Sequence, residues 1–304
     1  MPQGRLPVRY LPPTIGERDR FLMIVKTYPS PSKRYGETVC CAGWDARTRD
    51  WVRVFPVNFR SLAEYSRFRK WPFIEASWEP AKDGRPESRH VHQDSIRVGE
   101  YLPSGSGWRE RRQWLDPLVV DSLEDLEADR LAHGRTLGVI RPAEILKLEI
   151  RPAQGWDAES KDSLEQLSLA WTGDRAPRGD LEIIPYDFVY HFRCRGERCH
   201  TIHKMEIFDW EAAQAYRNWR RKYGKDGWEA AFRDKWERWL PTQDLHLVLG
   251  THHQFKNWLI VGVLYPPRAK VDEVKRRSAS KLHGEERPMT LPFVEFEAEE
   301  SDGR

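Results

Sequence analysis

The sequence contains no uninterrupted run of about 18 apolar residues, the length that a helix needs to cross a bilayer. Its start, Met-Pro-Gln-Gly-Arg-Leu-Pro, also lacks the apolar stretch of a secretory signal. Four cysteines in 304 residues are too few for a disulfide framework and suit reduced thiols or metal ligation better. These absences argue against a membrane-spanning or disulfide-rich secreted protein, and we expect a cytoplasmic one.

Several common catalytic motifs are missing as well. The sequence has no phosphate-binding loop of the Gly-x-x-x-x-Gly-Lys type, no dinucleotide fingerprint and no Gly-x-Ser-x-Gly elbow. Charge of one sign is also lacking, because 50 Lys and Arg stand against 47 Asp and Glu. A net charge of +3 does not by itself imply a polyanionic partner. The sequence therefore names no reaction and leans away from an enzyme.

What is present is material for one large or two ordinary hydrophobic cores, with 39% hydrophobic residues and fourteen Trp. Composition and turn residues divide the chain into an extended arm, two β-rich domains and a charged tail with an acidic end. The predicted bounds are 1–18 for the arm, 19–153 and 181–268 for the domains, and 269–304 for the tail.

Short apolar runs separated by turn residues, at 21–28, 37–44 and 51–57, predict an antiparallel meander that starts a small barrel. A helical insertion follows in the same domain. In the second domain, strands are predicted at 186–194, 245–250 and 258–265. Between them, two helices, from Asp209 to about Tyr223 and from about Trp228 to Pro241, are separated by Gly224 and Gly227. The predicted class is α+β, with two small antiparallel β-barrels and a helical hairpin in the second.

The segment Cys194-Arg-Gly-Glu-Arg-Cys199-His200-Thr-Ile-His203 has the spacing of a zinc knuckle, in which a short loop between two thiolates wraps the ion. We expect a structural Zn²⁺ held by Cys194, Cys199 and His203, with His200 as the fourth ligand. The alternatives for the fourth position are His191, His252, His253, Cys40 and Cys41. Two buried thiols without any metal are the competing interpretation.

Basic residues gather in two places. On the first helix after the knuckle, Arg217, Arg220, Arg221 and Lys222 follow one another with no acid between them. In the first domain, Arg53 and Arg60 are interleaved with aromatic residues. Arginine forks bind phosphate, and small barrels combine such cations with aromatic rings on which bases stack. These residues predict contacts with DNA or RNA, although a solvated helix face explains the same charge.

Two further hypotheses remain open. Asp209 and Glu211 are the carboxylates of a possible metal-dependent nuclease, but their place at a helix N-terminus is equally explained by capping. A protein-interaction subunit of a larger complex would suit the Pro-rich arm and the acidic tail.

Residues 20–267 resemble a family of uncharacterised prokaryotic proteins. The resemblance rests on Glu37-Thr-Val-Cys-Cys-Ala-Gly, Trp51-Val-Arg-Val-Phe-Pro-Val, the Cys194–His203 spacing and Val261-Gly-Val-Leu-Tyr-Pro-Pro. The Cys-Ala-Gly hairpin followed by Trp-Val-Arg also resembles, more distantly, proteins with two OB-type barrels. This implies that both β-rich domains are OB-like and that the role is a nucleic-acid-associated accessory one, linked to mobile elements or defence. It assigns no catalytic residue.

Overall fold

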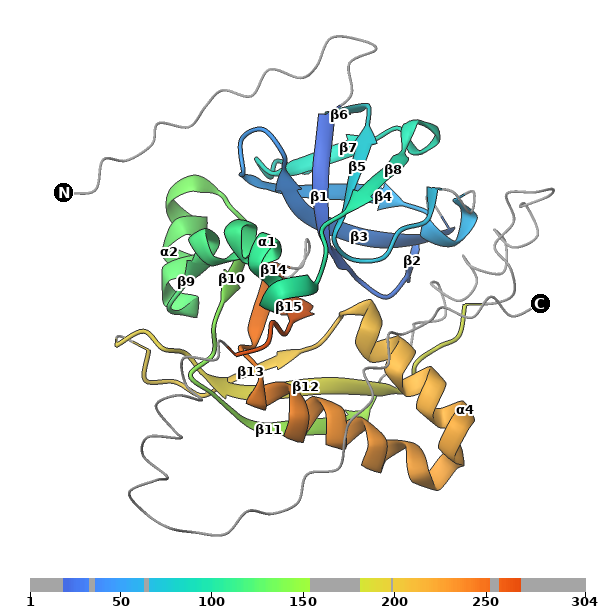
Figure 1. Cartoon of the computed structure of the whole chain (residues 1–304), viewed down its shortest axis with the longest axis vertical. Coiled ribbons are helices and arrows are strands. Elements are labelled where there is room, and N and C mark those ends of the chain that lie inside the picture. The colour runs from blue at the N-terminus through green and yellow to red at the C-terminus, as the bar shows by residue number, and fades with distance from the viewer. Residues whose placement is uncertain are drawn as a thin grey trace. The chain divides into compact units, whose positions relative to one another are not determined.

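The computed structural model describes residues 19–32, 36–62, 66–153, 181–197, 199–251 and 257–268 (Figure 1). The chain divides into two compact units, Met1–Pro267 and Arg268–Arg304, and the description below concerns the first. The predicted arm, 1–18, and tail, 269–304, lie outside the described residues. Among the described residues, no helix has the length and apolar character needed to span a membrane. The protein is of mixed α+β class, as predicted.

The N-terminal part is a curled sheet of eight strands. Its strands are β1 Asp19–Lys26, β2 Ser30–Ser32, β3 Gly36–Asp45, β4 Trp51–Val57, β5 Pro72–Ala76, β6 Trp78–Pro80, β7 Ser88–Val91 and β8 Arg97–Tyr101. Short 3-10 helices, η1 Phe59–Ser61 and η3 Gln93–Ser95, lie between them. The predicted meander corresponds to β1, β3 and β4.

The strand pairings of this sheet form a ring. β1 pairs antiparallel with β3 and β3 with β4, whereas β4 pairs parallel with β7, which pairs antiparallel with β6. The other edge of β1 pairs antiparallel with β5, and only Ser77 separates β5 from β6. β5 and β6 therefore act as one bent strand that returns the pairings to β1. Alternate apolar side chains such as Phe21, Met23, Val54 and Ile74 fill the inside.

A helical region connects the two parts. It consists of α1 Gly105–Leu115, η4 Asp116–Leu118, the short strand β9 Val119–Val120 and α2 Leu123–His133. Three residues near the start of α1, Ser106, Gly107 and Trp108, have left-handed φ angles of 52°, 67° and 63°. Gly134 ends α2 in the left-handed conformation at φ 74°, which glycine adopts without steric cost.

The C-terminal part has two sheets, ordered β15-β14-β10-β9 and β11-β12-β13. The strands are β10 Leu137–Ile140, β11 Glu144–Pro152, β12 Tyr186–Arg193, β13 His203–Glu206, β14 His246–Thr251 and β15 Trp258–Leu264. The sheets are joined twice. Only residues 141–143 separate β10 from β11, and Ile207, just after β13, bridges Ile260 of β15 in parallel.

The pairings in this part also form a ring, in the order β10–β11, β12, β13, β15, β14 and back to β10. The predicted first domain runs to residue 153. By their pairing, however, β10 and β11 belong with the C-terminal strands, since β10 pairs with β14 and β11 with β12.

The predicted helical hairpin is present. The helix α4, Trp210–Arg233, is interrupted at Gly224, whose φ of 74° and ψ of −170° break the helical geometry and divide α4 into two arms (Figure 1). The second arm continues into a π-helix, η5 Asp234–Trp239, and the 3-10 helix η6 Leu240–Thr242. Across the hairpin, the ring centroids of Tyr216 and Trp228 lie 4.8 Å apart.

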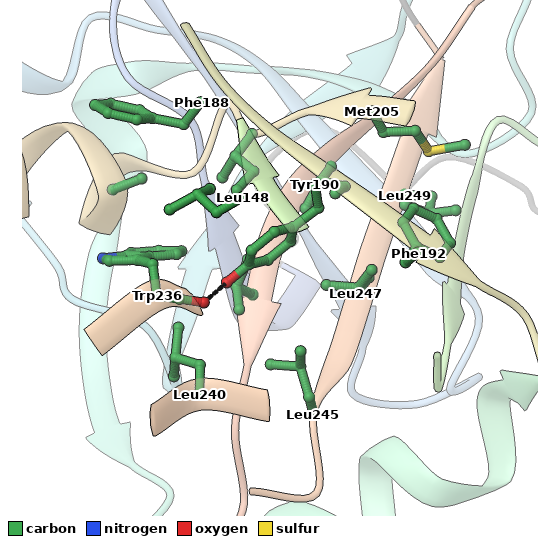
Figure 2. Close-up of a cluster of buried hydrophobic side chains, with 14 of the residues drawn as sticks. Leu148, Phe188, Tyr190, Phe192, Met205, Trp236, Leu240, Leu245, Leu247 and Leu249 are labelled. Atoms are coloured by element: carbon green, nitrogen blue, oxygen red, sulfur yellow. Dashed lines mark hydrogen bonds between the residues drawn. The ribbon is translucent and has the colours of Figure 1, made fainter. Parts of the chain in front are cut away.

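Aromatic side chains on alternate positions of β12 form the centre of the C-terminal core. Phe188, Tyr190 and Phe192 point inward, and Phe188 stacks on Phe232 of α4 with centroids 4.2 Å apart. The fully buried Tyr190 donates its hydroxyl hydrogen bond to the backbone carbonyl of Trp236 at 2.5 Å (Figure 2). This bond ties the π-helix to the sheet.

The bond is testable by Tyr190→Phe, which keeps the ring and removes only the donor. We expect the free energy of unfolding to fall by about 1–2 kcal/mol, because the buried carbonyl of Trp236 loses its partner. Urea unfolding measures this. The matched control is Tyr223→Phe, since the Tyr223 side chain is 46% exposed and its loss of a hydroxyl should change little. Equal losses in both variants would contradict the assignment.

Candidate metal centre

Four side chains with metal-binding atoms converge beside the turn that connects β12 to β13. The ligand atoms of Glu124, Cys194, Cys199 and His203 all lie within 4.8 Å of one another. The Cys199 Sγ is 3.0 Å from His203 Nε2, which is 3.9 Å from Glu124 Oε1. Ligands at 2.0–2.3 Å from a tetrahedral ion are roughly 3.3–3.8 Å apart, so the cluster is within about 1 Å of a closed site.

Local structure brings these residues together. Cys194 follows β12, Cys199 lies in the turn, and His203 begins β13. The turn docks on the start of α2, because the backbone amides of residues 195 and 196 both donate to the Asp121 carbonyl at 3.0 Å. Gly196 permits this approach, since a Cβ there would lie 2.8 Å from the Cβ of Ser122.

Glu124 reaches the cluster from the first turn of α2. That helix is capped by Ser122, whose hydroxyl accepts from the Asp125 amide at 3.1 Å. The Glu124 side chain is 41% exposed, whereas that of His203 is 9% exposed and its ring packs on Phe192. The centre is therefore more exposed to solvent at the carboxylate than at the imidazole.

Burial raises the pKa of the Cys194 thiol to about 12, and the nearby Cys199 and Glu124 act in the same direction. A divalent cation among these groups would reverse this effect, because its charge stabilises thiolate and carboxylate together.

The structure brings together three of the four predicted ligands and replaces the fourth. His200 is exposed and lies outside the cluster. His191 pairs instead with Glu149 at 2.6 Å, and the Cys40 Sγ accepts from Arg53 at 3.2 Å. Cys41 is buried in the N-terminal core, and His252 and His253 fall outside the described residues. Glu124, 70 residues before Cys194, was not predicted, because an acid in the first turn of a helix is explained by the helix dipole alone.

The predicted phosphate-binding residues on α4 differ in exposure. Arg221 and Lys222 are exposed beside the Gly224 bend, as is Lys225. Arg220 is half-buried. Arg217 is also half-buried, and its guanidinium donates to Glu182 at 2.5 Å and to Gln214 at 3.2 Å. The cations available to a ligand are therefore those at the bend.

Arg53 and Arg60, in contrast, bind partners inside the protein. Arg53 is 4% exposed and donates to both the carbonyl and the hydroxyl of Thr136, which links β4 to the segment before β10. Arg60 pairs at 2.9 Å with Glu37, whose side chain is 4% exposed. Both guanidinium groups neutralise or satisfy buried partners, so neither is presented to a phosphate.

The two candidate nuclease carboxylates also form hydrogen bonds and ion pairs within the protein. Asp209 is 1% exposed; one oxygen caps α4 by accepting from the Glu211 amide at 2.9 Å. The other accepts from Lys70 Nζ at 2.7 Å and from the Val263 amide at 2.6 Å. Lys70 also lies 3.2 Å from Glu211. Since both oxygens of Asp209 are engaged, this geometry does not favour a metal ion between Asp209 and Glu211.

Burial alone would lower the pKa of Lys70, but the charges of Asp209 and Glu211 outweigh it and raise that pKa. The Lys70–Asp209 pair is thus a buried ion pair between the segment before β5 and the start of α4.

Removing one partner tests its contribution. We expect Lys70→Met to lower the free energy of unfolding by about 3–5 kcal/mol, because Asp209 is left buried without a counter-charge. The control is Arg151→Met, whose half-exposed side chain pairs with Asp187 at 3.1 Å and with Glu206 at 3.3 Å. Each of these ion pairs is expected to contribute under about 1 kcal/mol. Adding Asp209→Asn to Lys70→Met should restore part of the loss. Similar losses for Lys70→Met and Arg151→Met would refute this role.

Two known domain families match the N-terminal and the C-terminal parts of the chain separately. Residues 17–117 match the model described as Domain of unknown function (DUF8758), which spans the strands β1 to β8 and the helix α1. Among curated proteins, none matches the chain. Residues 119–283, more than half of the chain, match the model described as Domain of unknown function (DUF8757) and include all four side chains of the metal cluster. The chain therefore belongs to the DUF8757 family.

Proposed function

We propose that the chain is a nucleic-acid-binding protein with two OB-type barrels and a structural zinc ion. The observation that carries the proposal is the exposed ring of Tyr223, which stands among exposed cations at the bend of α4. The pairing order of the strands and the donor set of the metal cluster support the other two parts.

The OB-type assignment rests on strand order. In each half, the first strand pairs with the second and the fourth. The third pairs in parallel with the fifth in the N-terminal half, and in the C-terminal half Ile207, just after the third strand, forms a single parallel bridge to Ile260 of the fifth. In chain order these strands are β1, β3, β4, β5–β6 and β7 in one half, and β10–β11, β12, β13, β14 and β15 in the other. A five-stranded Greek-key barrel with this order is an OB-type barrel, an architecture that often binds oligonucleotides. Because fold alone does not fix function, the ligand has to be argued from side chains.

The donor set favours zinc. Two thiols and one imidazole are the soft and borderline ligands that zinc prefers, and the carboxylate is a hard oxygen ligand that zinc also accepts. Together they give the four ligands of a tetrahedron. A fourth protein ligand leaves no open position, which is typical of a structural site. The ion would fasten α2 to the turn between the second and third strands of the C-terminal barrel.

The proposed nucleic-acid contact lies at the bend of α4. The Tyr223 side chain is 46% exposed, and Lys222 Nζ lies 5.1 Å from its ring centroid. Arg221 and Lys225 are exposed on either side, together with one acid, Asp226. Single-stranded nucleic acids bind to such combinations, in which a base stacks on the ring and cations meet the phosphates.

The metal cluster and this bend lie at opposite ends of β12. Tyr186 at the start of the strand packs on Trp228 of the hairpin, with centroids 4.9 Å apart, whereas Cys194 follows its last residue. A strand of eight residues spans about 25 Å, so the ion does not contact the bend. The two parts of the proposal are therefore tested separately.

For the metal, we expect elemental analysis of the purified native protein to find one equivalent of zinc. Cys194→Ser should lose it, because a hydroxyl is a poor substitute for a thiolate ligand. Cys40→Ser should retain it, since that sulfur lies outside the cluster. Glu124→Gln should weaken zinc binding in competition with a chelator, whereas His200→Gln should not. Native protein without metal would exclude the site.

For the nucleic acid, binding of labelled single-stranded DNA and RNA should fall steeply with salt concentration. We expect Tyr223→Ala to weaken binding by about 1–3 kcal/mol through lost stacking. Arg221→Ala and Lys225→Ala should each reduce the salt slope by about one.

The control for these variants is Arg238→Ala, because Arg238 is 63% exposed on η5 and pairs with Asp234 in its own helix. Binding that is absent, or equally weakened by Arg238→Ala, would contradict a contact at the bend. Absent binding would favour a protein-interaction subunit instead.

A further inference from the structure

A second group of charged residues gathers around Glu211 and Tyr265, where α1, the start of α4, η5 and the end of β15 meet. The Tyr265 hydroxyl donates to Glu211 at 3.4 Å. Its ring lies 6.1 Å from that of Trp108 and 5.7 Å from that of Trp239, with Lys235 Nζ 5.6 Å from its centroid. The side chain of Glu211 is 38% exposed, so this group reaches solvent.

Arg111 of α1 packs against two aromatic rings at one side of this group. Its guanidinium carbon lies 4.9 Å from the ring centroid of Trp71 and 4.7 Å from that of Trp108. Nε donates to the carbonyl of Leu102 at 2.9 Å. Within the described part of the chain, its two terminal nitrogens form no ion pair with a carboxylate, and the fork they make is the part that grips planar anions.

Both tryptophans that flank Arg111 have left-handed backbones, Trp71 at φ 75° and Trp108 at φ 63°. For a residue with a bulky side chain this conformation costs on the order of 1–3 kcal/mol and occurs preferentially at functional sites. The rings of these two residues pack on the Arg111 guanidinium and help to fix its position.

The charges in this group do not balance. Lys70, Arg111 and Lys235 are three cations, against the two carboxylates of Asp209 and Glu211. Lys70 pairs with Asp209 at 2.7 Å and with Glu211 at 3.2 Å, so the three cations share the two carboxylates. Burial lowers the pKa of Arg111 to about 10 and also lowers that of Lys235, because neighbouring carboxylates only partly compensate each cation. An added anion would relieve both.

We propose that Arg111 and Lys235 form a binding site for a phosphate monoester, with the Tyr265 hydroxyl and the rings of Trp108 and Trp239 beside it. A monoester suits the site because its three terminal oxygens can accept hydrogen bonds from both cations at once. The group is either that of a free mononucleotide or the terminal phosphate of a nucleic-acid strand. The site is independent of the contact at the α4 bend.

Titration calorimetry on the full chain, with chloride keeping the ionic strength constant, tests the site. We expect inorganic phosphate and AMP to bind, and adenosine not to bind. Lys235→Gln and Arg111→Gln should each weaken phosphate binding by roughly 10- to 100-fold, the range expected for a lost hydrogen bond to a charged group. Arg238→Gln, on the same helical segment and in its own exposed ion pair, should leave it unchanged.

Oligonucleotides with and without a 5′-phosphate distinguish a strand end from a free nucleotide as the source of the phosphate. A 5′-phosphorylated oligonucleotide that gains affinity over its 5′-hydroxyl form, with a gain that disappears in Lys235→Gln, identifies the end of a strand. Equal affinity of the two forms, with AMP still bound, identifies a free nucleotide. Should Arg111→Gln fail to fold, Arg111→Lys keeps the charge and removes the fork, and is expected to bind phosphate more weakly. No binding of phosphate or AMP to the wild-type protein, or an equal loss in Arg238→Gln, overturns the proposal.

Discussion

The arrangement of the two β-rich parts, the hairpin and the charged groups depends on the hydrogen bonds and the ion pair of the Asp209 carboxylate. It caps the first turn of α4, accepts from the backbone of β15 and pairs with Lys70 from the N-terminal sheet. Backbone contacts surround it, since Thr27 bridges Asp209 and the Tyr28 amide donates to the Phe208 carbonyl at 3.0 Å. With less than 2% of its surface exposed, the residue holds a charge that only these partners stabilise.

The sequence predicted local structure well where short-range physics decides it. Two glycines, Gly224 and Gly227, indicated a break between two helices, and the structure has a helical hairpin with its bend at Gly224. A strand was predicted at 186–194, and Phe188, Tyr190 and Phe192 of β12 form its inward face. These features depend on residues a few positions apart.

Contacts between distant segments were predicted less well. Arg53 has the same chemistry as a phosphate-binding arginine, and only the arrival of Thr136 from 83 residues away makes it an interior residue. Glu124 joins the metal cluster because α2 docks on the β12–β13 turn, which no local pattern shows. Lys70 likewise finds Asp209 across 139 residues. The sequence showed which residues could bind a metal or carry charge, whereas their contact partners depend on the fold.

Three features of this chain are thus separated in space and differ in their physical nature. The thiol-containing cluster lies where a turn docks on α2, the bend of α4 presents a ring among cations, and the group around Glu211 holds partly buried cations. The proposed accessory role on nucleic acid would accommodate all three, because a metal would stabilise the fold while the other two groups would contact different parts of the ligand.

The buried bond between Lys70 and Asp209 has a consequence for how such chains are inherited. Lys70 lies within the segment matched as DUF8758 and Asp209 within that matched as DUF8757. A gene encoding only one of the two segments would lack one partner of this ion pair, and the remaining charged group would have no counter-charge from the other segment. We therefore expect the two segments to occur together in genomes, as a single evolutionary module, wherever both of these residues are present.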